Sequence, residues 1–301
     1  MSIMFLGVLK ASAQTFSTPW ISYPTPDSTS QVWFRQTYPA KGHPEQASIT
    51  ITSTGNFDLF VNQYNVSTDV LIPYRDEATD NSIAITYDVT RFLRNGENTI
   101  AVWYAPSYPH ITDRQIAVSF SGRSKYGQPF SYVSDGNWIC RQSNHSITTD
   151  GNESIDANSY PLRWKSNDID AACWLTAAPA SDNQSEATTT LQSFYTGKRV
   201  SKILNPNYFD IEGDSVIYDF GTAFKGWIRV TIRNAKEGER INIGGLEYIC
   251  NGNIDEQACR KFSIAECRRV IICGDENFKQ EQIQKVEGIA IESYPHASYR
   301  Y

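Results

Sequence analysis

Six cysteines carry the most distinctive chemistry in this chain of 301 residues. Four of them, Cys250, Cys259, Cys267 and Cys273, fall in one segment, and no CxxC pair occurs. Their spacings match none of the common zinc patterns, in which paired cysteines stand only a few residues apart. We therefore expect either disulfides, whose connectivity the sequence does not fix, or plain buried thiols.

The groups of a hydrolytic active site are not identifiable. Four histidines, His43, His110, His145 and His296, are scattered without the spacing of metal ligands. No serine has the context of a nucleophile elbow. Acidic residues are frequent, but surface solvation accounts for most of them, and the acid-rich run 255–269 is expected to be a loop. The sequence therefore predicts no catalytic residue and no enzyme activity.

One loop has the residue types of a sugar-binding surface. Tyr104, Tyr108 and His110 lie at the end of a predicted strand and in the proline-punctuated segment that follows it. Their rings are expected to form a platform on which a sugar can stack, with Arg75 adding hydrogen bonds. The alternative is a loop that packs against a domain junction.

Short strands are the elements that would position these side chains. They are predicted at 31–38, 48–53, 56–61, 82–87, 99–104 and 115–120, and again at 191–195, 216–220, 227–232, 240–243, 269–272 and 287–293. Apolar and polar residues largely alternate in 48–52 and 82–86, which is typical of a sheet with one buried face. Segments of helical period are absent. The pattern predicts an all-β chain of two jelly-roll β-sandwiches, with Trp33 and Trp227 in the cores.

Polar stretches divide the chain. Residues 144–159 and 179–190 are rich in Ser, Thr, Asn and Asp and are expected to be loop and linker. We place the boundary near residue 180, giving domains at 15–180 and 181–301. Residues 1–14 have an apolar stretch followed by Ala11-Ser12-Ala13, which predicts the remnant of a signal peptide and a periplasmic or secreted protein. A short buried strand is the alternative.

The net charge argues against nucleic acid as a partner, and the hydropathy argues against a membrane-spanning segment. The formal net charge is −6 and Lys and Arg form no cluster, which argues against nucleic acid. No apolar run approaches the roughly 20 residues that span a bilayer, so no transmembrane segment is predicted.

Four segments, in order, resemble the amino-terminal part of bacterial alpha-L-rhamnosidases. The first is Gly55-Asn56-Phe57-Asp58-Leu59-Phe60-Val61-Asn62, with Pro73 and 85–90 after it, and the second is the run 95–102. The third contains Glu153, Asp156, Trp164 and Trp174. The fourth is Tyr218-Asp219-Phe220-Gly221 with 226–230. The resemblance implies two non-catalytic β-domains of galactose-binding-like type over roughly residues 31–294.

The same resemblance implies where the chemistry of those enzymes lies. The segment similar to 286–291 leads there into a helical barrel that holds the catalytic carboxylates, and this chain stops within about ten residues of that point. Some relatives resemble a module that binds rhamnose through calcium. Asp76, Asp80 and Asn81 are the oxygen ligands expected for such an ion here, although their loop departs from the residues that the relatives carry.

Three functions follow as hypotheses. The first is a non-catalytic protein that binds carbohydrate, in particular rhamnose-containing chains, within a glycan-degrading system. The second is the front piece of a split or truncated alpha-L-rhamnosidase that docks a separate catalytic chain. The third is a scaffold for protein contacts. An exposed apolar patch on the second sandwich would favour docking.

Overall fold

The computed structural model describes residues 16–25, 29–76, 81–108, 114–160, 163–180, 189–192 and 194–297. The described chain is built almost entirely of β-strands, which confirms the predicted all-β class. Its helices are single 3₁₀ turns at η1 (Thr90–Phe92), η2 (Ala157–Ser159), η3 (Ala171–Cys173) and η4 (Gln280–Gln282). No helix among the described residues is long and apolar enough to cross a membrane.

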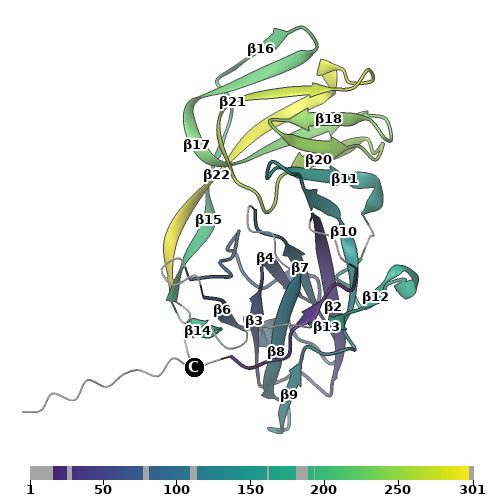
Figure 1. The fold of residues 1–301 in the computed structure, drawn as a ribbon, viewed down its shortest axis with the longest axis vertical. Coiled ribbons are helices and arrows are strands. Elements are labelled where there is room, and N and C mark those ends of the chain that lie inside the picture. Colours follow the sequence, from purple (N-terminus) through teal and green to yellow (C-terminus); the bar gives the residue numbers. More distant parts are fainter. Residues whose placement is uncertain are drawn as a thin grey trace, which may run out of the picture.

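Two sheets form the first sandwich, in the lower half of Figure 1. The smaller sheet has the order β13 (Ala178–Pro179), β1 (Ile21–Ser22), β8 (Gln115–Arg123), β3 (Gln46–Ser53), β6 (Ile83–Asp88) and β14 (Thr190–Gln192), with β9 (Pro129–Val133) paired to β8. The opposite layer consists of β10 (Ile139–Ile147), β2 (Ser30–Ala40), β7 (Gly96–Ala105), β4 (Asn56–Val61) and β5 (Tyr64–Asn65), and β12 (Leu175–Thr176) pairs with β10. Alternate residues such as Ile49, Ile51, Val102 and Leu59 fill the space between the layers.

The second sandwich, in the upper half of Figure 1, continues this larger sheet. Its strands are β15 (Phe194–Leu204), β22 (Ile283–Ala297), β17 (Ser215–Arg233), β21 (Ala265–Gly274), β18 (Arg240–Ile243) and β19 (Leu246–Ile249), with β16 (Tyr208–Glu212) and β20 (Asp255–Cys259) paired to β17. A parallel pair of β11 (Glu153–Asp156) and β19 joins the two halves. A separate core containing Val230, Ile232 and Ile272 lies inside this unit. The predicted boundary near residue 180 stays a prediction, because 181–188 lie outside the described residues.

Two segments expected to be loops contain strands. The polar stretch 144–159 includes the end of β10 and all of β11. The acid-rich run 255–269 begins with β20, in which Glu256 and Ala258 face inward. The Glu256 carboxylate accepts hydrogen bonds from the Tyr248 hydroxyl at 3.0 Å and from two backbone N–H groups of the adjoining turn at 2.9 Å. The acid-rich pattern was misleading because one of its acidic residues, Glu256, is buried in a strand and satisfied by hydrogen bonds.

Large aromatic side chains fill the junction between the two sandwiches. We call Trp33, Trp103, Trp164, Trp227 and Phe262 the junction cluster. Trp33 and Trp164 stack with ring centroids 5.0 Å apart, and Trp103 from β7 meets Phe262 of the second sandwich edge-on at 5.8 Å. All five side chains are buried, which confirms the prediction that Trp33 and Trp227 belong to cores.

A buried carboxylate fixes the loop that carries Phe262. Glu153, on β11, is fully buried and accepts backbone N–H hydrogen bonds from Phe262 at 2.8 Å and Ser263 at 2.6 Å, and from Lys261 at 3.0 Å. His145 lies 3.5 Å away. Burial by itself would raise the pKa of Glu153, but His145 and the backbone donors outweigh it and hold the pKa below its ordinary value. The ionised carboxylate therefore stabilises the contact between the sandwiches.

Candidate functional site

The predicted aromatic platform is not assembled as expected. Tyr104 lies on β7 with no exposed surface, inside the core of the first sandwich, and its hydroxyl is 3.1 Å from Oγ1 of Thr54. Its ring therefore offers no face to a sugar. Tyr108 is half exposed, but one side of its ring lies against Gly151, where a Cβ would come within 2.6 Å. His110 lies outside the described residues.

Of the remaining predicted residues, Arg75, Asp76 and Asn81 lie close to one another in the structure. Arg75 forms an isolated β-bridge with Ser82, and its guanidinium lies 5.8 Å from the centroid of the Tyr74 ring. The backbone N–H of Asp76 donates to the carbonyl of Asn81 at 2.9 Å. Asp80 lies outside the described residues, so the calcium site stays a prediction. Among the described residues, no group of three or more His, Cys, Asp or Glu side chains is arranged to hold a metal ion.

The cysteines are free thiols. Cys140, Cys250 and Cys267 are buried, and burial raises the pKa of Cys140 and Cys250 to about 12. Cys173 is exposed. The structure therefore agrees with plain buried thiols for three of the six cysteines, and none of the six forms a disulfide.

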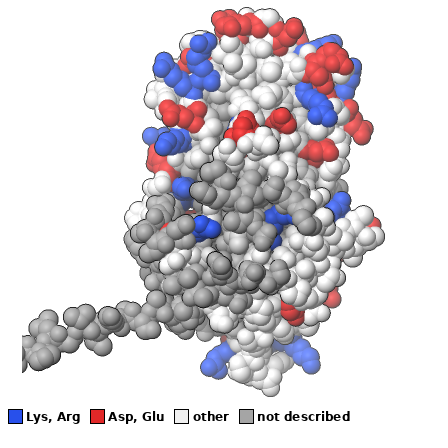
Figure 2. All heavy atoms as spheres, viewed as in Figure 1, with Lys and Arg blue, Asp and Glu red and all other residues white. Residues whose placement is uncertain are grey.

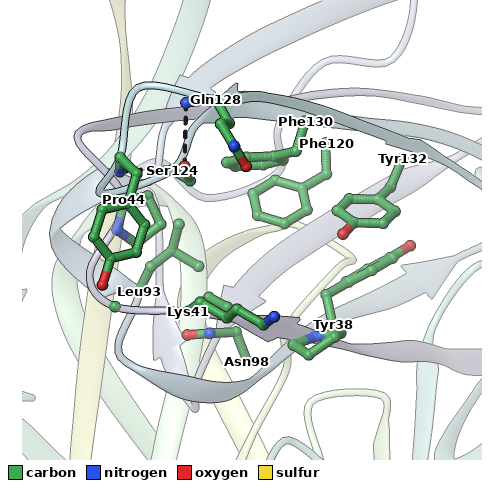
Figure 3. A pocket seen from close by; sticks show the side chains of 14 residues that line it. Tyr38, Lys41, Pro44, Leu93, Asn98, Phe120, Ser124, Gln128, Phe130 and Tyr132 are labelled. Atoms are coloured by element: carbon green, nitrogen blue, oxygen red, sulfur yellow. Dashed lines mark hydrogen bonds between the residues drawn. The ribbon is translucent and has the colours of Figure 1, made fainter.

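A different part of the first sandwich contains an open pocket. Its volume is about 310 Å³, at the lower end of the range of roughly 300–1,000 Å³ found for small-molecule sites. It lies where the end of β2 and the following turn meet β8, β9 and the start of β7 (Figure 3). We call this cavity the aromatic pocket. Its lining consists of Tyr38, Pro39, Ala40, Lys41, Gly42, Pro44, Leu93, Asn98, Phe120, Ser124, Tyr126, Gln128, Phe130 and Tyr132.

A tight hairpin holds one side of the aromatic pocket. Oγ of Ser124 accepts hydrogen bonds from the backbone N–H groups of Tyr126 at 3.3 Å and Gln128 at 3.2 Å, and the Ser124 N–H donates to the Gln128 carbonyl at 2.8 Å. Gly127 occupies the turn with φ of +73°, a conformation that favours glycine. On the opposite side, the N–H of Gly42 donates to Oδ1 of Asn95 at 2.7 Å. Both turns are therefore fixed by hydrogen bonds.

Aromatic rings from separate strands form the wall. Tyr38 of β2 and Tyr132 of β9 have ring centroids 4.8 Å apart, and Phe120 of β8 lies 5.1 Å from Phe130. Burial raises the pKa of Tyr38 well above its ordinary value, and its hydroxyl accepts a hydrogen bond from Nε1 of Trp138 at 3.1 Å. Tyr38 is thus a neutral, fixed part of the wall.

Polar groups without protein partners surround these rings. Tyr126 is 74% exposed and Tyr132 37% exposed, and Lys41 and Gln128 are exposed too. Within the described part of the chain, the side-chain ends of these four residues make no hydrogen bond or ion pair. Asn98 differs, because its amide is hydrogen-bonded to Asn62 and to the backbone of the neighbouring turn. The pocket therefore combines apolar ring faces with free donors and acceptors.

The lining of the aromatic pocket consists of aromatic rings, neutral polar groups and one lysine. The 14 lining residues include no Asp or Glu, so the pocket lacks the two carboxyl groups that most glycoside hydrolases use. Exposed aromatic faces beside hydrogen-bonding groups instead match the two surfaces of a sugar ring, one of C–H groups and one of hydroxyls. The sequence analysis missed the pocket, although Tyr126, Phe130 and Tyr132 stand two and four residues apart, the spacing that places side chains on one face of a strand.

Comparison with known proteins gives a consistent result. The family model of the alpha-L-rhamnosidase N-terminal domain matches residues 42–194 of this chain. The family model of the bacterial alpha-L-rhamnosidase concanavalin-like domain matches residues 210–301. Two alpha-L-rhamnosidases of Formosa agariphila are 26% identical over 56% of this chain and 24% identical over 76% of it. The chain spans only 21% and 26% of the lengths of these relatives.

Solved structures show the same fold. An alpha-L-rhamnosidase from Dictyoglumus thermophilum superposes with a TM-score of 0.80 at 19% identity, covering 91% of this chain and 35% of the other. The alpha-L-rhamnosidase from Aspergillus terreus superposes with a TM-score of 0.78 at 17% sequence identity, and the match covers 92% of this chain and 36% of the other. Since the first family model covers more than half of the sequence, the chain belongs to the family of alpha-L-rhamnosidase N-terminal domains.

Proposed function

We propose that this chain is a non-catalytic carbohydrate-binding protein of a glycan-degrading system, and that it binds sugar in the aromatic pocket. The observation that carries the proposal is the pocket itself. It is an open cavity of about 310 Å³ with aromatic walls, with polar side chains at its rim that have no partner among the described residues, and with no Asp or Glu among its 14 lining residues. Rhamnose-containing chains are the first ligands to test, because the matched relatives are alpha-L-rhamnosidases.

The test is a calorimetric titration of the purified protein with rhamnose-containing oligosaccharides. Tyr126→Ala removes the most exposed ring of the pocket and is expected to weaken binding about tenfold, since losing about 1.4 kcal/mol of contact lowers affinity by that factor. Tyr64→Ala is the matched control, because Tyr64 is 66% exposed on the same sandwich but lies outside the pocket. Unchanged affinity in Tyr126→Ala, or equal losses in both variants, would contradict the proposed site.

The same titration addresses the ion predicted for Asp76, Asp80 and Asn81. We propose calcium as a ligand of that segment, and its oxygen-rich side chains support the idea. Repeating the titration with a chelator separates the two sites. Binding in the aromatic pocket is expected to persist, whereas a sugar held through calcium would be released.

A second candidate function, docking to a separate catalytic chain, has support on the other sandwich. Every residue of β16 is exposed, including Tyr208, Phe209 and Ile211 at 50–60%. Val200 and Ile203 on the preceding strand β15 are 44% and 58% exposed. Exposed apolar side chains on outer strands are found on surfaces that another protein covers.

Reconstitution tests this second function. The chain is mixed with a catalytic alpha-L-rhamnosidase barrel, and release of rhamnose from an artificial glycoside is measured. Docking predicts a gain in activity that Phe209→Asp abolishes, because a charge on β16 would be buried unpaired. A gain that survives this substitution would place the contact elsewhere, and no gain would remove the docking function.

A further inference from the structure

Charge is distributed unevenly around the aromatic pocket. The two segments that build most of it, 38–44 and 120–132, contain three cationic side chains, Lys41, Arg123 and Lys125, and no Asp or Glu. The third segment, 93–98, adds Arg94 and Glu97, whose charges cancel. The whole chain has a formal net charge of −6. Carboxylates lie close by as well, because Glu45 follows the first segment and Asp135 acts electrostatically on Tyr38, so the cation that belongs to the lining itself is Lys41.

Figure 2 shows this distribution on the surface. Lys and Arg lie on both sides of the lower tip, below the point where β9 is labelled in Figure 1. Asp and Glu, mixed with further Lys and Arg, surround the second sandwich at the opposite end, and some Asp or Glu also lie just above the lower tip. At an ionic strength near the physiological one, charges act over about 8 Å, so the charges that matter for a ligand are those close to the pocket.

One of the cations belongs to the pocket itself. Lys41 is the only charged side chain among the 14 lining residues. In Figure 3 it lies along the side opposite Phe120 and Phe130, with its nitrogen directed toward Tyr38. It makes no ion pair or hydrogen bond with any described residue. By contrast, Lys125 packs its aliphatic stem over Gly42, where a Cβ would come within 2.6 Å of Cδ.

We infer that the aromatic pocket takes an acidic sugar residue, with the anionic group on the Lys41 ammonium and the C–H face of the ring on the aromatic wall. The inference rests on the proposed sugar-binding function and specifies its ligand. Gln128 and the Tyr126 hydroxyl are positioned at the rim to bind the ring hydroxyls. The anionic group can be the carboxylate of a uronic acid or a sulfate ester, since an ammonium binds both as a point charge.

Paired oligosaccharides test the inference. The probes are a galacturonic acid tetramer and its carboxyl-reduced counterpart, and a sulfated tetramer and its desulfated counterpart. Wild-type protein is expected to bind at least one acidic member about tenfold more tightly than its neutral partner, as a charge-assisted hydrogen bond would give. Which pair shows the difference identifies the anion. Added salt should weaken only the acidic complex.

Two variants assign the effect to one side chain. Lys41→Gln is expected to abolish the preference for the acidic member and to leave the affinity for the neutral member unchanged. Lys225→Gln, at an exposed lysine on β17 that makes no ion pair with any described residue, should bind as wild type does. Thermal unfolding of both variants checks that the fold is intact.

The outcomes separate the inference from the function beneath it. Equal affinity for acidic and neutral members would overturn the acidic ligand and leave sugar binding in place. A preference that persists in Lys41→Gln would also overturn it. Absence of binding to every oligosaccharide, including the neutral and rhamnose-containing ones, would overturn the proposed function as well.

Discussion

The junction cluster and the aromatic pocket are both built from aromatic rings, yet they meet solvent in opposite ways. At the junction, Trp33 and Trp164 stack on each other and are 0% and 1% exposed. In the pocket, Tyr126 and Tyr132 are 74% and 37% exposed beside a cavity of about 310 Å³. The rings of the junction cluster pack against one another without open space, whereas the rings of the aromatic pocket border a cavity that can hold a ligand.

Three of the four junction tryptophans have hydrogen-bonded indole N–H groups, whereas Nε1 of Trp33 is buried without a hydrogen-bond partner among the described residues. Nε1 of Trp103 donates to Oε1 of Gln31 at 2.8 Å, and Nε1 of Trp227 donates to the Ser263 carbonyl at 2.7 Å. The Tyr126 and Tyr132 hydroxyls have no such partner in the described part of the chain. Aromatic content alone therefore does not indicate a binding site; open space beside exposed rings does.

Removing a ring from the junction should have the largest effect on folding. Trp33→Ala is expected to lower the free energy of unfolding by about 3–5 kcal/mol, because it deletes a fully buried ring and leaves a cavity. Tyr126→Ala, the same kind of truncation in the pocket, should change it by less than about 0.5 kcal/mol. Denaturant unfolding measures both. Similar losses in the two variants would break the distinction between the clusters.

Replacing the buried carboxylate of Glu153 at the junction should have the next largest effect on stability. Glu153→Gln should lower the free energy of unfolding by about 1.5–3 kcal/mol, because a neutral amide replaces a charged acceptor of several backbone N–H groups. Glu247→Gln is the control, since Glu247 is exposed on the adjoining strand β19. The same unfolding experiment applies. If both variants unfold alike, Glu153 does not hold the sandwiches together.

The stabilising effect of Glu153 should depend on pH. Its pKa is lower in the folded chain than the roughly 4.3 of an unfolded glutamate, so its contribution is fully present above that value. The contribution is lost as the pH falls through the folded pKa. The difference in unfolding free energy between wild type and Glu153→Gln is therefore expected to be constant near neutrality and to shrink in acid. A difference that grows in acid would reverse the assigned sign.

The smallest effect is expected at the rim of the pocket. Gln128→Ala should weaken sugar binding by about 0.5–1.5 kcal/mol, the value of one hydrogen bond, without changing stability. Calorimetry with the best oligosaccharide measures it. Gln284→Ala, at an exposed site on β22, provides the comparison. Equal affinity in wild type and Gln128→Ala would remove this side chain from the site.

The fold was largely predictable because strand alternation is a local signal. The period-two pattern at 48–52 and 82–86 corresponds to β3 and β6, and the expected strand 56–61 matches β4. The same rule, applied to β7, would have corrected the prediction that the Tyr104 ring is exposed in a sugar-binding platform. It shares its side of β7 with Ile100 and Val102, both buried, so the pattern itself predicted a core position.

The pocket was not predictable in the same way. Tyr38, Phe120 and Tyr132 come together only through the pairing of β8 with β9 and the packing of one sheet on the other. The parallel pairing of β11 with β19 is equally remote from any local pattern, because it joins residues more than 90 positions apart. Such contacts depend on the register of the whole sheet and not on neighbouring residues.

Hydrogen exchange with and without a bound oligosaccharide tests the location of the site most directly. The account predicts that a saturating ligand slows amide exchange in the segments 38–44 and 120–132 and leaves β15 and β16 unchanged. Protection confined to the segment with Arg75 and Asp76, or to the second sandwich, would contradict the assignment of sugar binding to the aromatic pocket.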